Sequence, residues 1–245
     1  MLVALGRQRA RALDALRWRP EWWAALVVAA AWLALIAGLG AHDDMTEHEM
    51  ASTGVGGILD RLPGWVLMVV AMMVLVTLPA ARHVGLNSIR TRRIRAISLY
   101  LVVYVGAWSV FGFVVLGAED LIRTNTALGG RSLLTAALAG AAGWQLTRSK
   151  LRALYACGRT VPLPPVGLRA DVGCAHFALV HAARCMRSCW ALMVVMTLVG
   201  HWSVLWMAAL TGIVLIEELT LLGRRLLGLS AVALALAAGM LMLGV

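Results

Sequence analysis

Seven apolar segments follow one another along the chain, separated by short polar or basic stretches. Each segment is close to the ~20 residues that a helix needs to cross the hydrocarbon core of a bilayer. Composition agrees, because 61% of the 245 residues are hydrophobic and only 14% are charged. We therefore expect an all-α protein, a polytopic transmembrane helical bundle of six to seven spans in one integral membrane domain. The predicted spans are 22–41, 64–81, 97–117, 127–146, 183–200, 203–222 and 227–245.

The positions of the basic residues predict the orientation of these spans. Arginine and lysine are concentrated before the first span and in every second loop after it, whereas the other loops carry most of the acids. By the positive-inside rule, the N-terminus lies in the cytoplasm and the C-terminus outside. The first span is longer than the core of a signal peptide, so we expect an uncleaved anchor. The expected location is a bacterial plasma (inner) membrane, crossed several times.

The strong positive charge does not indicate nucleic acid as a partner. The net charge is +10 and the isoelectric point is near 10.9, but the basic residues form short runs between apolar segments, as cytoplasmic loops do. We expect the lipid bilayer as the surroundings and no nucleic acid. The chain also has no phosphate-binding glycine loop and no Gly-x-Ser-x-Gly or His-Glu-x-x-His motif, so a binding protein is favoured over an enzyme.

The stretch CAHFALVHAARCMRSCWALM, residues 174–193, holds three of the four cysteines. His181, Cys185 and Cys189 are spaced by four residues, so a helix places them on one face. Thiolates with an imidazole suit Cu(I) or zinc. The alternative is that these cysteines are small packing residues in a membrane helix. In either case all four cysteines are expected to be reduced, since the topology places them on or near the cytoplasmic side.

Three further residues could complete such a metal site. Cys174 lies seven residues before His181 and joins the same face if the helix extends that far. Cys157, in the loop before, could be a fourth ligand if that loop folds back. Glu217 could reach the cluster if span 203–222 packs against span 183–200, although a glutamate near a span end also pairs with nearby arginines.

A second candidate site lies in the first outer loop, whose stretch HDDMTEHEM covers residues 42–50. His42, Met45, His48 and Met50 form a donor set for copper, and the neighbouring acids attract cations. The alternative is an ordinary solvated acidic loop. Within span 64–81, Met68, Met72 and Met73 could form a thioether site for Cu(I), or be packing residues.

Several stretches resemble one family. HAARCMRSCWALM resembles the signature His-Gly-x-x-Cys-x-Gly-Cys-Cys-Trp-x-Leu-Met of the predicted metal-binding integral membrane proteins, a bacterial domain of unknown function. GWVLMVVAMM, GWQLTRSKLRALYACGR and GHWSVLWMAALTGIVLIEEL resemble its other motifs, over about residues 60–228. The resemblance implies a metal site at His181, Cys185 and Cys189. Two family cysteines are replaced, by Ser188 and Ala153.

Together these patterns predict an integral membrane protein that binds or handles a soft transition metal, copper in preference to zinc. A metal-delivering protein or a larger membrane complex would be its partner. Two alternatives stay open at this point. One is a non-metal accessory or assembly subunit of such a complex, and the other is a metal-dependent membrane oxidoreductase.

Overall fold

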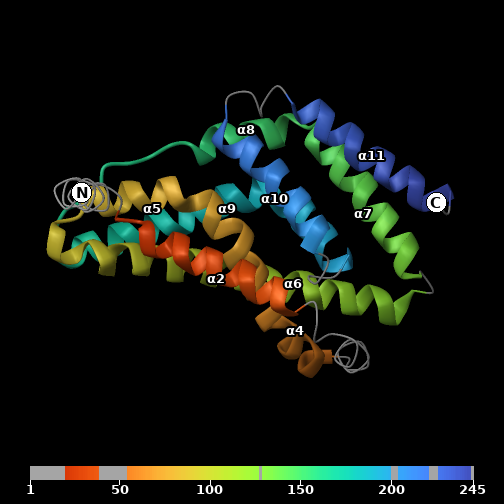
Figure 1. The fold of residues 1–245 in the computed structure, drawn as a ribbon, viewed down its shortest axis with the longest axis horizontal. Helices are drawn as coiled ribbons and strands as arrows, with labels where there is room; N and C mark the ends of the chain where they lie inside the picture. The colour runs from red at the N-terminus through yellow and green to blue at the C-terminus, as the bar shows by residue number, and fades with distance from the viewer. Residues whose placement is uncertain (1–19, 39–53, 127–128, 200–203, 221–225, 244–245) are drawn as a thin grey trace, which may run out of the picture.

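The computed structural model describes residues 20–38, 54–126, 129–199, 204–220 and 226–243. Within these ranges the regular structure is entirely helical, with no strand, which confirms the predicted all-α class (Figure 1). The helices, in chain order, are α2 (Trp22–Gly38), α4 (Gly54–Val69), the π-helical turn η1 (Val70–Val74), α5 (Leu75–Asn87), the 3-10 turn η2 (Arg90–Arg92), α6 (Arg93–Asn125), α7 (Gly130–Gln145), α8 (Arg148–Cys157), α9 (Leu168–Val199), α10 (Val204–Leu219) and α11 (Leu227–Leu243).

Three helical segments of the described chain are long and apolar enough to cross a membrane. They cover Gly54–Asn87, Arg90–Asn125 and Leu168–Val199, and the shorter helices α2 and α11 are apolar as well. A helix lies at the position of every predicted apolar segment. The number of crossings and the orientation stay predictions.

The helix of the fifth predicted span begins earlier than its apolar run. The prediction placed the span at 183–200, whereas α9 runs unbroken from Leu168 to Val199. Arg184 interrupts the apolar pattern without breaking the helix, because arginine is a good helix former. Its guanidinium donates to the carbonyl oxygen of Ala156 at 3.2 Å. The whole Cys/His stretch therefore lies on one helix.

The connection between the predicted spans 127–146 and 183–200 contains a helix of its own, α8. Thr147 caps α8 by accepting a hydrogen bond from the backbone N–H of Lys150 at 3.1 Å, as threonine does at a helix N-terminus. The VPLPP stretch that follows is not helical, as its prolines dictate. This turn lets α8 fold back and pack against α9.

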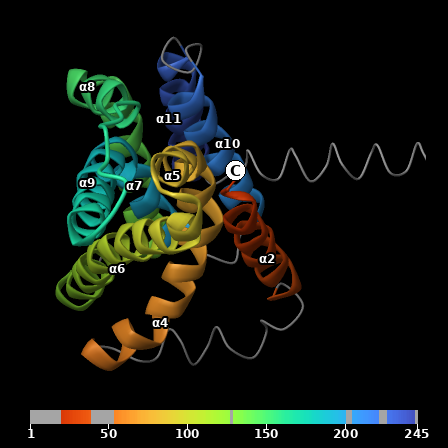
Figure 2. The ribbon, with the colours of Figure 1, turned by 90° about the vertical axis from the view of Figure 1, so that its left-hand side faces the viewer.

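The core forms around α6 and α9, which pack against each other. On one side α4 packs on α6, where the Trp65 indole donates to the carbonyl oxygen of Trp108 at 2.9 Å. On the other side α7 contacts α9 and carries α11 along its length (Figures 1 and 2). The helix α10 contacts α5, α8 and α9, so it lies between the two sides.

The π-helical turn η1 sits inside the long helical segment Gly54–Asn87. Such turns are rare and occur frequently at functional sites. The Trp32 indole on α2 donates to the carbonyl oxygen of Ala71 in this turn at 3.1 Å. Met72 and Met73 of the same turn are fully buried, so they face the protein core rather than lipid.

Replacement of Gly112 by alanine tests the packing of α4 on α6. A Cβ at Gly112 would collide with the indole of Trp65, and such overpacking costs about 1–3 kcal/mol. We expect Gly112→Ala to lower the thermal unfolding temperature of the detergent-purified protein. Gly106→Ala on the same helix is the matched control, because nothing lies within 4 Å of its added Cβ. Equal unfolding temperatures for the two variants would contradict this packing.

Candidate metal centre

Two cysteines and one glutamate converge in the protein interior. The Sγ atoms of Cys185 and Cys189 and a carboxylate oxygen of Glu218 all lie within 4.8 Å of one another. Both cysteines are fully buried and free, and Glu218 is partly exposed. Two thiols and a carboxylate at this spacing can hold one metal ion. We call these three residues the cysteine–glutamate group.

The fold of α9 and α10 explains why these residues meet. The cysteines are one helical turn apart, so their side chains share a face of α9. Only residues 200–203 separate the end of α9 at Val199 from the start of α10 at Val204. Cys185 is fourteen residues before Val199 (199 − 185) and Glu218 is fourteen after Val204 (218 − 204). A chain that turns back at this point therefore returns Glu218 to the level of Cys185.

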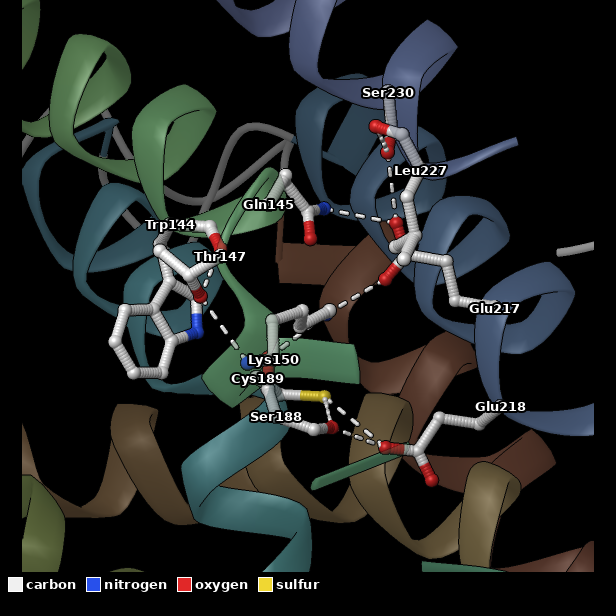
Figure 3. Close-up of polar contacts among 10 residues, drawn as sticks. All are labelled: Trp144, Gln145, Thr147, Lys150, Ser188, Cys189, Glu217, Glu218, Leu227 and Ser230. Carbon is white, nitrogen blue, oxygen red and sulfur yellow. Dashed lines mark hydrogen bonds and ion pairs between the residues drawn. The ribbon is translucent and has the colours of Figure 1, made fainter. Parts of the chain in front are cut away.

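Hydrogen bonds orient each member of the group. The Ser188 hydroxyl donates to Glu218 Oε1 and lies 3.1 Å from Cys189 Sγ. The Cys189 thiol also donates to Glu218 Oε1, at 3.5 Å (Figure 3). The Tyr104 hydroxyl, from α6, donates to Cys185 Sγ at 3.1 Å. Both sulfurs and the carboxylate are thus held in place before any metal arrives.

Cys157 lies beside the cysteine–glutamate group. It is the last residue of α8, and its buried thiol interacts with the Glu218 carboxylate. Burial, followed by the nearby Glu218 carboxylate, raises the pKa of the Cys157 thiol well above its usual range, so this thiol is neutral at pH 7 until a metal displaces its proton. The loop before α9 therefore folds back, which was the condition on which Cys157 could become a fourth ligand.

Glu217 lies in a different network. Its Oε2 forms an ion pair with Lys150 Nζ at 2.7 Å, and its Oε1 accepts from the Gln145 amide at 2.8 Å and the Ser230 hydroxyl at 2.9 Å. Lys150 also donates to the carbonyl oxygen of Ser188 at 2.8 Å (Figure 3). The sequence singled out Glu217, but it is the neighbouring Glu218 whose carboxylate lies with the cysteines.

Cys174 lies far from the cysteine–glutamate group. It is on α9, and its thiol donates to the carbonyl oxygen of Ala96 at 3.2 Å. The eleven residues between Cys174 and Cys185 correspond to about 16 Å along a helix axis. Cys174 instead packs in a separate part of the core with Tyr100 and Phe177.

His181 lies one turn before Cys185 and is buried, with 7% of its surface exposed. Its ring packs against Phe177, Tyr100 and Tyr104, and its Nδ1 atom has no hydrogen-bond partner in the described part of the chain. A buried ring nitrogen without a hydrogen-bond partner is available to bind a ligand. The outer-loop candidates His42, Met45, His48 and Met50 lie outside the described residues.

Four residues that build this region were not predicted as part of it, namely Glu218, Ser188, Lys150 and Tyr104. Glu217 was chosen in place of Glu218, Ser188 stood on the cysteine face as a replaced cysteine, and Lys150 was one of the basic residues. A lysine in a loop carries no local signal that it will be buried. The contacts of all four depend on how α6, α8 and α10 pack against α9, which periodicity along one helix does not reveal.

Removal of the Lys150 ammonium tests the buried ion pair. Lys150→Met leaves the Glu217 carboxylate buried without its counter-ion, which costs about 3–5 kcal/mol. We expect a lower thermal unfolding temperature for Lys150→Met, and partial recovery in the double variant Lys150→Met/Glu217→Gln, where neither charge remains. A double variant no more stable than the single one would show that the two charges do not depend on each other.

Comparison with known proteins adds one finding. No curated protein and no solved structure matches the chain. A family model described as PpoB2, copper chaperone, matches residues 62–242. This agrees with the metal-related family that the motifs predicted, and the matched segment contains Cys157, Cys185, Cys189 and Glu218. Because the match covers well over half of the sequence, the chain belongs to the PpoB2 copper chaperone family.

Proposed function

We propose that this protein is a multi-pass membrane copper chaperone that takes up Cu(I) at Cys185, Cys189 and Glu218 and hands it to another protein. The supporting observation is the cysteine–glutamate group itself, two buried reduced thiols and a carboxylate within 4.8 Å. The family match supports copper as the cargo. A metal-delivering protein and a copper-accepting membrane complex would be its partners.

The family match, together with the two buried thiols, favours copper over zinc. Thiolates are soft ligands that suit Cu(I), and structural zinc sites usually need four nitrogen or sulfur ligands in a closed tetrahedron. The described group offers two sulfurs and one carboxylate, with a third sulfur at Cys157 beside it. Copper would bind the two cysteines as thiolates, so each thiol gives up a proton. Both protons would leave to water past the partly exposed Glu218, whose carboxylate already accepts from Cys189 and then stays free to bind copper.

The burial of the group suggests the route by which copper enters and leaves. Both cysteines are fully buried, whereas Glu218 is partly exposed. Cys157 is the last residue of α8, the helix that packs against α9 and α10 next to them. Copper would therefore pass Glu218 and Cys157 on its way between the cysteines and this surface of the protein. With the predicted orientation this entrance faces the cytoplasm of a bacterial cell. The loop with His42, Met45, His48 and Met50 would collect copper on the outer face.

Metal content of the purified protein tests this proposal. We would express wild type and the Cys185→Ser/Cys189→Ser variant with added copper and with added zinc, and measure bound metal by mass spectrometry. We expect near-stoichiometric copper in wild type and background copper in the double variant. Cys174→Ser is the matched control, because Cys174 is equally buried but lies outside the group. Negligible metal in all three proteins would contradict the proposal and favour the accessory-subunit alternative.

A gain of affinity is expected when the replaced family cysteine is restored. Ser188 already contacts Cys189 Sγ and Glu218, so Ser188→Cys adds a third thiolate at the group. We expect tighter Cu(I) binding in chelator competition by about tenfold, equivalent to about 1.4 kcal/mol. The control is Ser109→Cys, since among the described residues the Ser109 hydroxyl bonds only to the Val105 carbonyl of its own helix. Equal affinities for both variants would place copper elsewhere.

A further inference from the structure

The buried face of α9 carries metal-binding side chains well beyond the cysteine–glutamate group. His181, Cys185, Cys189, Met193 and Met196 follow one another at intervals of four, four, four and three residues, so they share one side of the helix. The histidine has 7% of its surface exposed and the other four have none. We call these five residues the soft-donor face.

The soft-donor face spans most of the thickness of a membrane. The fifteen residue steps from His181 to Met196 (196 − 181) correspond to about 22 Å along the helix axis, compared with about 30 Å for the hydrocarbon core of a bilayer. Neighbouring members are about 4.5–6 Å apart along the helix axis, close to one helical turn. One copper ion could therefore pass from one member to the next and stay bound to at least one ligand throughout.

Other helices add thioethers around this face. Met207 on α10 is three residues after Val204, and Met196 on α9 is three before Val199, so the two lie near the neighbouring ends of helices that contact each other. Met68, Met72 and Met73 come from α4 and η1. All of these methionines are at most 1% exposed and lie in the same core cluster as Cys185 and Cys189.

Two observations distinguish this arrangement from ordinary packing. Methionine is a common gap-filler in cores, but here the thioethers continue the line of the cysteines. At the opposite end, His181 presents a buried Nδ1 atom without a partner among the described residues. An unsatisfied buried ring nitrogen is costly in a core, and it is a ready ligand for a soft ion.

We propose that the soft-donor face, from His181 past the cysteine–glutamate group to Met196 and Met207, conducts Cu(I) across the bilayer toward the end of α9. The inference rests on the proposed function and adds transmembrane movement to it. An ion without ligands would meet a large penalty inside the membrane, whereas a continuous row of soft ligands replaces its hydration. Each step forms a bond from copper to the next donor as the bond behind breaks. Copper stays monovalent, so no electron is transferred.

Flux of Cu(I) into proteoliposomes tests this proposal. Wild type and Met193→Leu/Met196→Leu would be reconstituted in phosphatidylethanolamine and phosphatidylglycerol vesicles that enclose a fluorescent Cu(I) indicator. Methionine and leucine have similar volumes, so the fold is retained. We expect bound copper at the cysteines to be unchanged and the flux to fall by at least about tenfold, the effect expected when groups at a metal site are lost.

The matched control is Met240→Leu/Met242→Leu on α11, whose methionines are 54% and 79% exposed. We expect wild-type flux from it. Flux of Met193→Leu/Met196→Leu equal to that of this control would overturn the proposal, and so would wild-type protein that binds copper but carries none across. In both cases, copper bound to the purified protein at the expected level would show that the proposed copper binding at the cysteines still holds. Loss of bound copper in Met193→Leu/Met196→Leu would also overturn the path, since the methionines would then belong to the binding site.

Discussion

A buried ion pair between Lys150 and Glu217 holds together the helices that form the metal centre. Its hydrogen bonds reach α7 through Gln145, α9 through the Ser188 carbonyl and α11 through Ser230. Both charges lie in the interior, where an unpaired charge is strongly unfavourable. The ion pair therefore holds α8, which carries Lys150, against α10, which carries Glu217. The pair thereby sets how α8 and α10 sit on α9. That placement brings Cys157 and Glu218 to the cysteines.

The metal centre follows from this packing more than from any single motif. Two cysteines on one helix give at most a two-sulfur site. Packing supplies the Glu218 carboxylate and the Cys157 thiol from two other helices. Replacement of a family cysteine by Ser188 changes a sulfur into a hydroxyl that hydrogen-bonds to Glu218. Compared with the signature that it resembles, this chain therefore has fewer sulfurs; position 188 keeps a polar group, whereas Ala153 offers none.

Local patterns in the sequence predicted the helices and the stripe of donors, because both depend on residues that are close in the chain. The apolar runs correspond to helices, and the four-residue spacing of Cys185 and Cys189 places them on one face. The sequence could not distinguish Glu217 from Glu218, since adjacent helical residues point about 100° apart and only the packing of α10 decides which faces α9. Spacing along α9 also placed Cys174 on the face of the other cysteines, although the packing of the helices buries it in another part of the core.

X-ray absorption at the copper edge of the copper-loaded protein identifies the atoms around the metal and so tests the proposed ligands. We expect monovalent copper with two sulfur neighbours and one light neighbour, the two cysteines and a Glu218 oxygen, and the nearby Cys157 thiol could add a further sulfur. A copper ion surrounded only by nitrogen and oxygen atoms would show that the cysteines do not hold the metal.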